Sequence, residues 1–127
     1  MPNWCENRLM ISADREKDMK EFKDKAFKKL EDGAEVFQFK NLIPMPEEEK
    51  ENWYEWNCNN WGTKWDVEAM TSNEDATLIE MEFDTAWGPP QGIYLHMYKN
   101  FPNLNISWFY HEPGIQIAGY LNDMGNT

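Results

Sequence analysis

The chain has 127 residues and a formal net charge of −11, and 15% of its residues are aromatic. This length predicts one domain over residues 1–127 that is large enough to bury a core. The aromatic content excludes a disordered polyelectrolyte, and no apolar run approaches the roughly 18 residues of a membrane-spanning helix. Because binding to phosphates relies on lysine and arginine, 23 acids against 12 bases disfavour duplex nucleic acid as a partner.

The start of the chain and its cysteines favour a cytoplasmic protein. Residues 1–6 contain neither the basic segment nor the apolar run of a secretory signal. Cys5 and Cys58 form neither a CxxC pair nor a zinc-ligand pattern, so we expect two reduced thiols. The alternative is that the fold brings Cys5 and Cys58 together, in which case a thiol titration would find no reactive sulfhydryl.

The N-terminal part of the chain predicts a strand and then a long helix. Leu9 and Ile11 alternate with their neighbours over residues 7–12, which is typical of a half-buried strand. Residues 14–32 carry apolar side chains at helical spacing, acids in the first turns and lysines in the last turn. Gly33 suits the position just after the C-terminus of this helix.

An insertion and a hairpin follow the first helix. The insertion covers about residues 34–64 and contains a short strand at 36–39 and an acidic, aromatic segment at 47–60, which we interpret as a short helix. The hairpin pairs residues 66–71 with residues 76–84 around a polar turn.

The C-terminal part predicts a helix and two strands. Pro89 and Pro90 suit the start of a helix, and Pro102 closes it. An alternating strand follows at residues 104–110, and a last strand at 115–121 turns back after it. This order predicts an α+β fold, a ferredoxin-like split β-α-β antiparallel sheet with two helices on one face and an extra C-terminal hairpin strand.

Connectivity brings four strand ends to one edge of this sheet, and two tryptophan-rich motifs lie at those ends. Aromatic walls with a few convergent polar groups are how small-ligand sites are built. The same residues would otherwise form an aromatic mini-core that pins the insertion to the sheet. The candidate binding residues at this edge are Trp4, Trp61, Thr63, Lys64, Trp65, Asp66, Trp87 and Glu112.

The second candidate surface is the sheet face that the two helices leave uncovered. Acids alternate with buried apolar residues along the second hairpin strand, Asp66 and Glu68 join them from the first hairpin strand, and Arg8 supplies one cation. Like charges that face one another across strands destabilise a sheet. These acids therefore indicate either a solvated face that blocks aggregation or a surface for a basic partner. The residues of this partner face are Glu68, Glu80, Glu82 and Asp84.

Several short motifs stand in order along nearly the whole chain. They are Pro2-Asn3-Trp4-Cys5-x-Asn7, Phe37-x-Phe39, Pro44-Met45-Pro46, Trp61-Gly62-Thr63-Lys64-Trp65-Asp66, Phe83-x-Thr85-Ala86-Trp87-x-Pro89-Pro90 and Tyr110-x-Glu112-x-Gly114. This pattern resembles the YubB-like family of phage and plasmid proteins, which carries a ferredoxin-like domain. The resemblance implies that fold, a mobile-element origin and a bacterial host. Because this family has no established chemistry, the resemblance implies no catalytic residues.

These observations lead to three functional hypotheses. We expect a non-catalytic accessory protein that binds a basic host protein, as an anti-defence factor does, with acids that imitate nucleic-acid phosphates. The alternative is a module that binds a nucleotide or a short single strand, with tryptophans for base stacking and Lys64 for a phosphate. An enzyme would need acid–base pairs such as His111 with Glu112, or Thr63 and Lys64 with Asp66. The sequence contains no P-loop, dinucleotide or metal motif, so we expect no catalysis, cofactor or metal.

Overall fold

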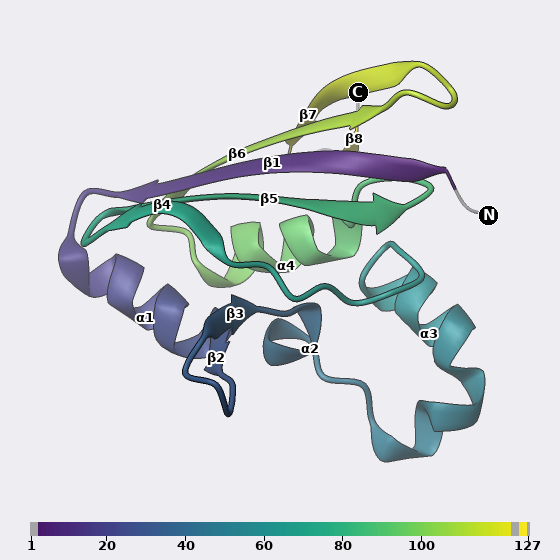
Figure 1. Ribbon diagram of the computed structural model, residues 1–127, viewed down its shortest axis with the longest axis horizontal. Coiled ribbons are helices and arrows are strands. Elements are labelled where there is room, and N and C mark those ends of the chain that lie inside the picture. The colour runs from purple at the N-terminus through teal and green to yellow at the C-terminus, as the bar shows by residue number, and fades with distance from the viewer. Residues whose placement is uncertain (1–2, 123–124, 127) are drawn as a thin grey trace.

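The centre of the fold is an antiparallel sheet with the strand order β4-β5-β1-β6-β7-β8. The structure, a computed structural model, describes residues 3–122 and 125–126. Helices α1 (Glu16–Ala26) and α4 (Gln91–Asn100) lie on the same face of the sheet (Figure 1), and within the described residues no helix covers the opposite face. The strands are β1 (Trp4–Ala13), β4 (Thr71–Asp75), β5 (Leu78–Ala86), β6 (Leu104–Glu112), β7 (Ile117–Asn122) and β8 (Gly125–Asn126).

The order of the central strands confirms the predicted ferredoxin-like fold. β1 lies between β5 and β6, and β4 pairs with the far side of β5, which is the arrangement of a split β-α-β sheet. The helices are segregated on one face, so the fold is α+β. β7 pairs with β6 and is the extra C-terminal hairpin strand.

The central strand β1 separates a buried side from an exposed side. Cys5, Asn7 and Leu9 are buried, and the residues between them are exposed, as alternation along a half-buried strand requires. Leu9 lies opposite Met81 on β5 and Trp108 on β6, all fully buried. Burying a leucine-sized side chain contributes about 1.5–3 kcal/mol, so this layer, together with the apolar sides of α1 and α4, forms the core.

The first helix ends earlier than the sequence predicts. α1 stops at Ala26 rather than near residue 32, because Phe27 begins a short strand. The rings of Phe27 and Phe37 pack with centroids 6.0 Å apart, and burial of this pair outweighs the helical spacing of the following residues. Gly33, expected after a helix, lies instead in the hairpin turn with φ +91°.

The insertion therefore begins at Phe27 and not at residue 34. Its hairpin pairs β2 (Phe27–Lys29) with β3 (Glu35–Phe37), so the strand predicted at 36–39 ends at Phe37. The remaining elements are α2 (Phe39–Leu42), a 3₁₀ helix (Glu47–Asn52) and α3 (Trp53–Asn60). The last two confirm a helical segment within 47–60, and the whole insertion lies on the helical side of the sheet (Figure 1).

The hairpin is shifted along the chain relative to the prediction. Its first strand is Thr71–Asp75 rather than 66–71, with Thr71 opposite Met81 and Asp75 opposite Leu78. Ala69 instead exchanges both backbone hydrogen bonds with Phe37 of the insertion, at 2.7 and 3.0 Å. This pairing draws residues 66–70 away from the sheet, so Asp66 and Glu68 do not lie on a sheet strand.

Two glycines allow the tryptophan-rich motif after α3 to pack against the start of α4. A Cβ atom on Gly92 would lie 2.1 Å from the carbonyl oxygen of Asn60, and one on Gly62 would lie 2.7 Å from the backbone nitrogen of Gln91. Gly62 also has φ +87°, which favours glycine. This close approach holds the motif against the start of α4, and Thr63, the next residue after Gly62, bonds to Ala86 at the end of β5.

Candidate functional site

The start of β1 and the end of β5 form one rim of the sheet. Trp4 lies opposite Ala86, and the backbone N–H of Trp87 donates to the carbonyl of Asn3 at 2.7 Å. The ring of Trp4 stacks on that of Trp65, with centroids 5.8 Å apart and planes inclined by 30°. The chain segments that carry Trp4, Trp65 and Trp87 therefore meet at this rim, as the connectivity predicts.

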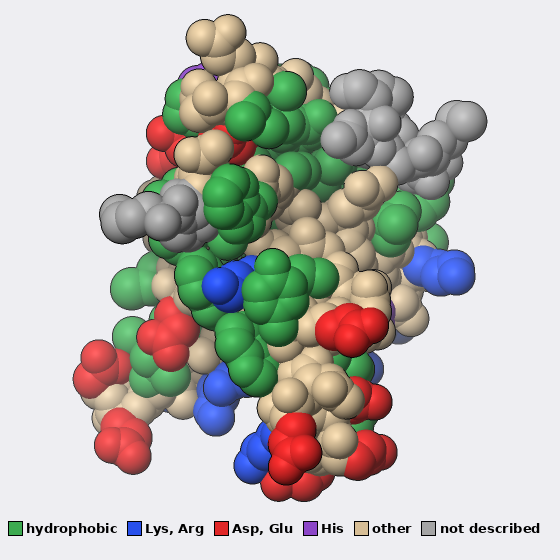
Figure 2. Space-filling view, turned by 90° about the vertical axis from the view of Figure 1, so that its right-hand side faces the viewer, with side chains coloured by type: hydrophobic (Ala, Val, Ile, Leu, Met, Phe, Trp, Pro, Cys, Tyr) green, Lys and Arg blue, Asp and Glu red, His purple; other side chains and the backbone are tan. Residues whose placement is uncertain are grey.

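Lys64 lies against two aromatic rings at the same rim. Its Nζ is 4.4 Å from the ring centroid of Trp65 and 5.1 Å from that of Tyr54 on α3. At an exposed site such a cation–π contact contributes about 0.5–1 kcal/mol. Figure 2, which faces this end of the molecule, shows hydrophobic side chains on both sides of a basic patch near its centre. We call Trp4, Tyr54, Lys64 and Trp65 the tryptophan rim.

Trp87 is exposed beside the rim on a strained backbone. Its φ is +71°, in a region that bulky side chains rarely adopt, yet 53% of the residue is exposed. The turn is fixed by the hydroxyl of Thr85, which donates to the carbonyl of Gly88 at 2.6 Å. The strain, of the order of 1–3 kcal/mol, is therefore not offset by burial of the indole.

Two candidate binding residues, Trp61 and Thr63, are buried and not available to a ligand. Trp61 is 4% exposed, and its Nε1 donates to the carbonyl of Ile43 at 2.9 Å. Its ring packs edge-on against Trp56 and Phe39. The hydroxyl of Thr63 donates to the carbonyl of Ala86 at 3.2 Å. Thr63 ties the insertion to the end of β5, and Trp61 packs within the insertion, so both residues fit the mini-core alternative.

Asp66 is also structural. Its carboxylate accepts hydrogen bonds from the backbone N–H groups of Phe39 and Lys40, the first residues of α2, at 2.6 and 3.2 Å, and from that of Val67 at 2.7 Å. Burial raises the pKa of this carboxyl above its ordinary value, and these three N–H groups offset only part of that shift. Asp66 caps a helix from a distant segment and is not part of the open rim.

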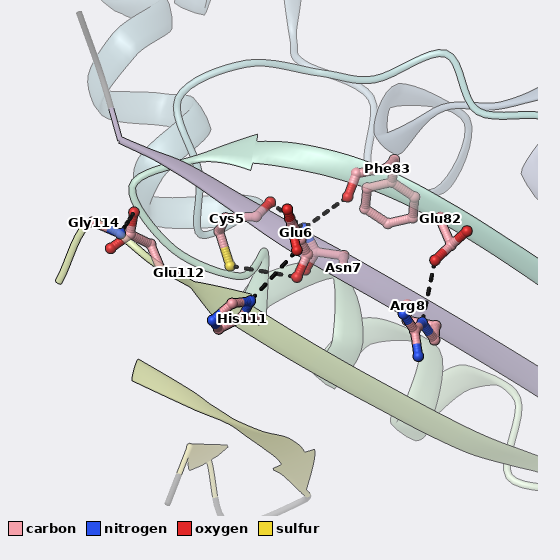
Figure 3. Close-up of polar contacts among 9 residues, drawn as sticks. All are labelled: Cys5, Glu6, Asn7, Arg8, Glu82, Phe83, His111, Glu112 and Gly114. Atoms are coloured by element: carbon pink, nitrogen blue, oxygen red, sulfur yellow. Dashed lines mark hydrogen bonds and ion pairs between the residues drawn. The ribbon is translucent and has the colours of Figure 1, made fainter. Parts of the chain in front are cut away.

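Glu112 stabilises the turn between β6 and β7. The residue is 1% exposed, and its carboxylate accepts hydrogen bonds from the backbone N–H of Gly114 at 3.2 Å (Figure 3) and from that of Ile115 at 2.6 Å. His111 points to the other face of β6, where its Nδ1 is 3.4 Å from Glu6. The structure does not bring His111 and Glu112 together as an acid–base pair, nor Thr63 with Asp66.

Asn7 is the polar centre beneath the rim. Its Nδ2 donates to the hydroxyl of Thr85 at 2.9 Å and to the carbonyl of Cys5 at 3.1 Å, and its Oδ1 accepts from the indole N–H of Trp108 at 2.9 Å. A third acceptor, the carbonyl of Phe83, lies at 3.3 Å (Figure 3). This role of Asn7 was not predicted from the sequence. The pattern that could have indicated it is an asparagine among the inward-facing residues of the strand, which are otherwise apolar.

The uncovered sheet face carries the acids predicted for β5. Glu82 and Asp84 are exposed and Glu80 is half-buried, whereas the residues between them point toward the core. Glu6 on β1 lies opposite Asp84 and adds a carboxylate that the sequence analysis did not assign to this face. Arg8 pairs with Glu82 at 3.2 Å (Figure 3). We call Glu6, Glu80, Glu82 and Asp84 the acidic face.

Glu68 lies across a groove from Glu82 and Asp84 and not on a strand of the sheet. It is exposed on the segment that leads to β4, and it accepts a hydrogen bond from Nε2 of Gln38 at 3.3 Å. The expectation that Asp66 and Glu68 extend the acidic face is wrong, because Ala69 pairs with Phe37 of the insertion instead of with β5.

The two thiols differ in accessibility and are not bonded to each other. Cys5 is fully buried and Cys58 is exposed, and both are free. Burial raises the pKa of the Cys5 thiol to about 11.

We expect the native protein to show one fast-reacting thiol, that of Cys58, at about pH 8, with Cys5 reacting only on unfolding. A chromogenic disulfide reagent measures both phases, with and without denaturant. Cys58→Ser serves as the control and should abolish the fast phase. Equal rates for both thiols in the folded protein would contradict this expectation.

The fold and the site define an α+β domain of the ferredoxin-like class with an aromatic rim and an acidic sheet face. Residues 60–123 match the family described as the ferredoxin-like domain in Api92-like protein, and the chain belongs to this family. No curated protein and no solved structure matches the chain. Among the described residues, no cluster of histidine, cysteine or acidic side chains is suited to hold a metal, and no helix is long and apolar enough to cross a membrane.

Proposed function

We propose that this chain is a non-catalytic accessory protein of phage or plasmid type that binds a basic host protein and inhibits or redirects it. Its resemblance to the YubB-like proteins favours a mobile-element origin and action in the cytoplasm of a bacterial host. The observation that carries the proposal is the acidic face: Glu80, Glu82 and Asp84 repeat on one strand, on a sheet surface that no helix of the described residues covers.

The spacing of these acids suits a partner that binds nucleic acid. Alternate residues of a strand lie roughly 6.6 Å apart, so the carboxylates form a regular row of negative charge, as backbone phosphates do. The pair between Arg8 and Glu82 is exposed on both sides, and such surface pairs contribute only about 0–1 kcal/mol. One arginine therefore leaves most of the negative potential of the face available to a basic surface.

Charge reversal of the face tests the proposal. The face variant carries Glu80→Lys, Glu82→Lys and Asp84→Lys. The matched control carries Glu47→Lys, Glu48→Lys and Glu51→Lys on the exposed 3₁₀ helix, with the same change in net charge. Wild type and control should retain the same proteins from a bacterial lysate at low salt, and the face variant should lose them. Retention should fall as salt rises.

Retention of the same proteins by the face variant would contradict the proposal, as would binding that high salt does not weaken. Circular dichroism and thermal unfolding of both variants show whether the fold is intact. Reversal relieves the like-charge contact between Glu6 and Asp84 but also breaks the exposed pair between Arg8 and Glu82, so we expect stability to change by about 1 kcal/mol or less in the face variant.

One observation favours a second candidate function, binding of a nucleotide or a short single strand at the tryptophan rim. Trp4 and Trp65 are stacked and 44% and 36% exposed, and Lys64 lies beside them. Stacking of a base on an aromatic side chain contributes about 1–3 kcal/mol.

Titration with mononucleotides, dinucleotides and cyclic nucleotides should then quench tryptophan fluorescence, and Lys64→Ala should weaken the effect. Lys17→Ala, at an exposed lysine on α1 outside the rim, is the control and should leave the titration unchanged. A flat response in wild type that Lys64→Ala does not alter would exclude this candidate.

A further inference from the structure

The outer edge of β5 is only half covered. β4 pairs with β5 from Leu78 to Met81, whereas residues 82–86 have β1 on one side and no strand on the other. On this outer side the carbonyl of Glu80 accepts a hydrogen bond from the hydroxyl of Ser72, and the carbonyl of Ala86 accepts one from the hydroxyl of Thr63.

These two bonds show which residues of β5 direct their backbone groups outward. Backbone N–H and C=O groups alternate between the two edges of a strand. Since Glu80 and Ala86 face the outer edge, Glu82 and Asp84 face it as well. Among the described residues, the segment 65–70 makes no backbone hydrogen bond to them. Glu82 and Asp84 therefore present an unpaired strand edge, a ready template for another extended chain.

A groove runs along this edge. It has a volume of about 630 Å³ and lies between residues 82–86 of β5 and the segment 65–70, with Trp4 at the end near Ala86. The far wall is held away from β5 by its own partners. The backbone N–H and C=O of Ala69 are both bonded to Phe37, and the side-chain carboxylate of Asp66 is bonded to the start of α2, so contacts with the insertion hold this wall in place.

The charged side chains that line the groove are all negative. Glu68 lines one wall and Glu82 and Asp84 line the other, and of the described residues that line it none is basic. The stacked rings of Trp4 and Trp65 give an apolar surface at one end.

We propose that this groove binds an extended segment of the partner protein, which adds a strand to β5 and carries lysine or arginine at alternate positions. Main-chain hydrogen bonds supply affinity in this mode of recognition, and alternate side chains supply specificity. The basic side chains of the added strand lie beside Glu82 and Asp84, because both sets repeat every second residue. This inference rests on the proposed function and identifies the part of the partner that is recognised.

Synthetic peptides test the inference on the intact protein. The first probe alternates lysine with threonine, and the second has the same composition with its lysines consecutive. Two further versions of the first probe are N-methylated, one at the lysines and one at the threonines. Binding is measured by tryptophan fluorescence and by the amide chemical shifts of residues 82–86.

The alternating peptide should bind and shift the amides of Glu82 and Asp84. One N-methylated series should lose about tenfold or more in affinity, and the other should bind as the parent does, because only one set of peptide amides faces β5. The variant with Glu82→Gln and Asp84→Asn should bind the alternating peptide several-fold more weakly, and Glu47→Gln with Glu48→Gln should not.

Equal binding of both N-methylated series, or of the consecutive-lysine peptide, would overturn the inference, since attraction between charges alone would then explain the result. Failure of the alternating peptide to bind would also overturn it. The proposed function is tested separately. If the lysate partners depend on the acidic face while no peptide binds, only the strand-addition inference fails.

Discussion

Replacing Trp61 by alanine should lower the free energy of unfolding by about 3–5 kcal/mol, the usual loss for a buried tryptophan. Trp61 is 4% exposed and packs against Phe39 and Trp56. The substitution removes these contacts and also the hydrogen bond that the carbonyl of Ile43 accepts from the indole N–H. Chemical denaturation followed by circular dichroism measures the change.

The control for this prediction is Trp65→Ala, four residues further along the same motif. Trp65 is 36% exposed and contacts Trp4 and Lys64 at the surface, so we expect a loss of about 1 kcal/mol or less. Equal losses for the two variants would show that the motif is not divided into a buried anchor and an exposed contact residue. The proposed base-stacking role of the rim would then lose its structural basis.

Replacing Asn7 by alanine should cost about 3 kcal/mol of stability. The substitution leaves the indole N–H of Trp108 buried without an acceptor, and an unsatisfied buried donor costs about 1–3 kcal/mol. The hydrogen bonds to Cys5, Phe83 and Thr85 are lost as well. Because these bonds join β1, β5 and β6, we expect the loss to appear as global unfolding and not as local fraying.

A double-mutant cycle with Trp108→Phe isolates the central bond. Phenylalanine has no N–H group to leave unsatisfied, so Asn7→Ala should cost about 1–2 kcal/mol less in that background. Thermal or chemical unfolding of the four proteins measures the coupling. Additive losses would show that the hydrogen bond between Asn7 and Trp108 contributes nothing beyond the packing of each residue.

The division of the tryptophan-rich motif has a consequence for binding. Thr63 bonds to the end of β5, whereas Trp61 bonds to Ile43 and Asp66 to the start of α2. These contacts position Lys64 and Trp65 at the surface beside Trp4. Substitutions at the buried residues should thus weaken binding only through the fold. Substitutions at Lys64 and Trp65 should affect a ligand while the domain remains folded, so the two groups can be separated by experiment.

The strand order could be predicted because its signals are short-range. Ile79 and Met81 alternate with Glu80 and Glu82, and this two-residue period identifies both a strand and its solvent face. Once two helices and four strands are placed in order, few topologies satisfy the connection rules, and the split β-α-β sheet is one of them. The meeting of Trp4 with residues 85–87 followed from that topology alone.

The errors arose where a distant partner outweighs a local pattern. Phe27 continues a helical stripe, yet it pairs with Phe37 and ends the helix. Residues 66–70 alternate as a strand does, but Ala69 bonds to Phe37, and the paired strand begins at Thr71. In each case the contact that decides the structure lies at least ten residues away, so a pattern read over a few neighbouring residues contains no record of it.

The amino-acid sequence by itself determined the class of fold, the alternation of β5 and the chain segments that meet at the rim, because periodicity and connectivity are properties of the chain order. Only the tertiary structure decided which rim residues are exposed. Trp61 and Trp65 are the same residue type in one motif, and Asp66 and Asp84 are both aspartates. Their burial differs because the insertion contacts only one member of each pair. Ile43 accepts a hydrogen bond from Trp61 and Phe39 donates one to Asp66, whereas Trp65 and Asp84 are exposed.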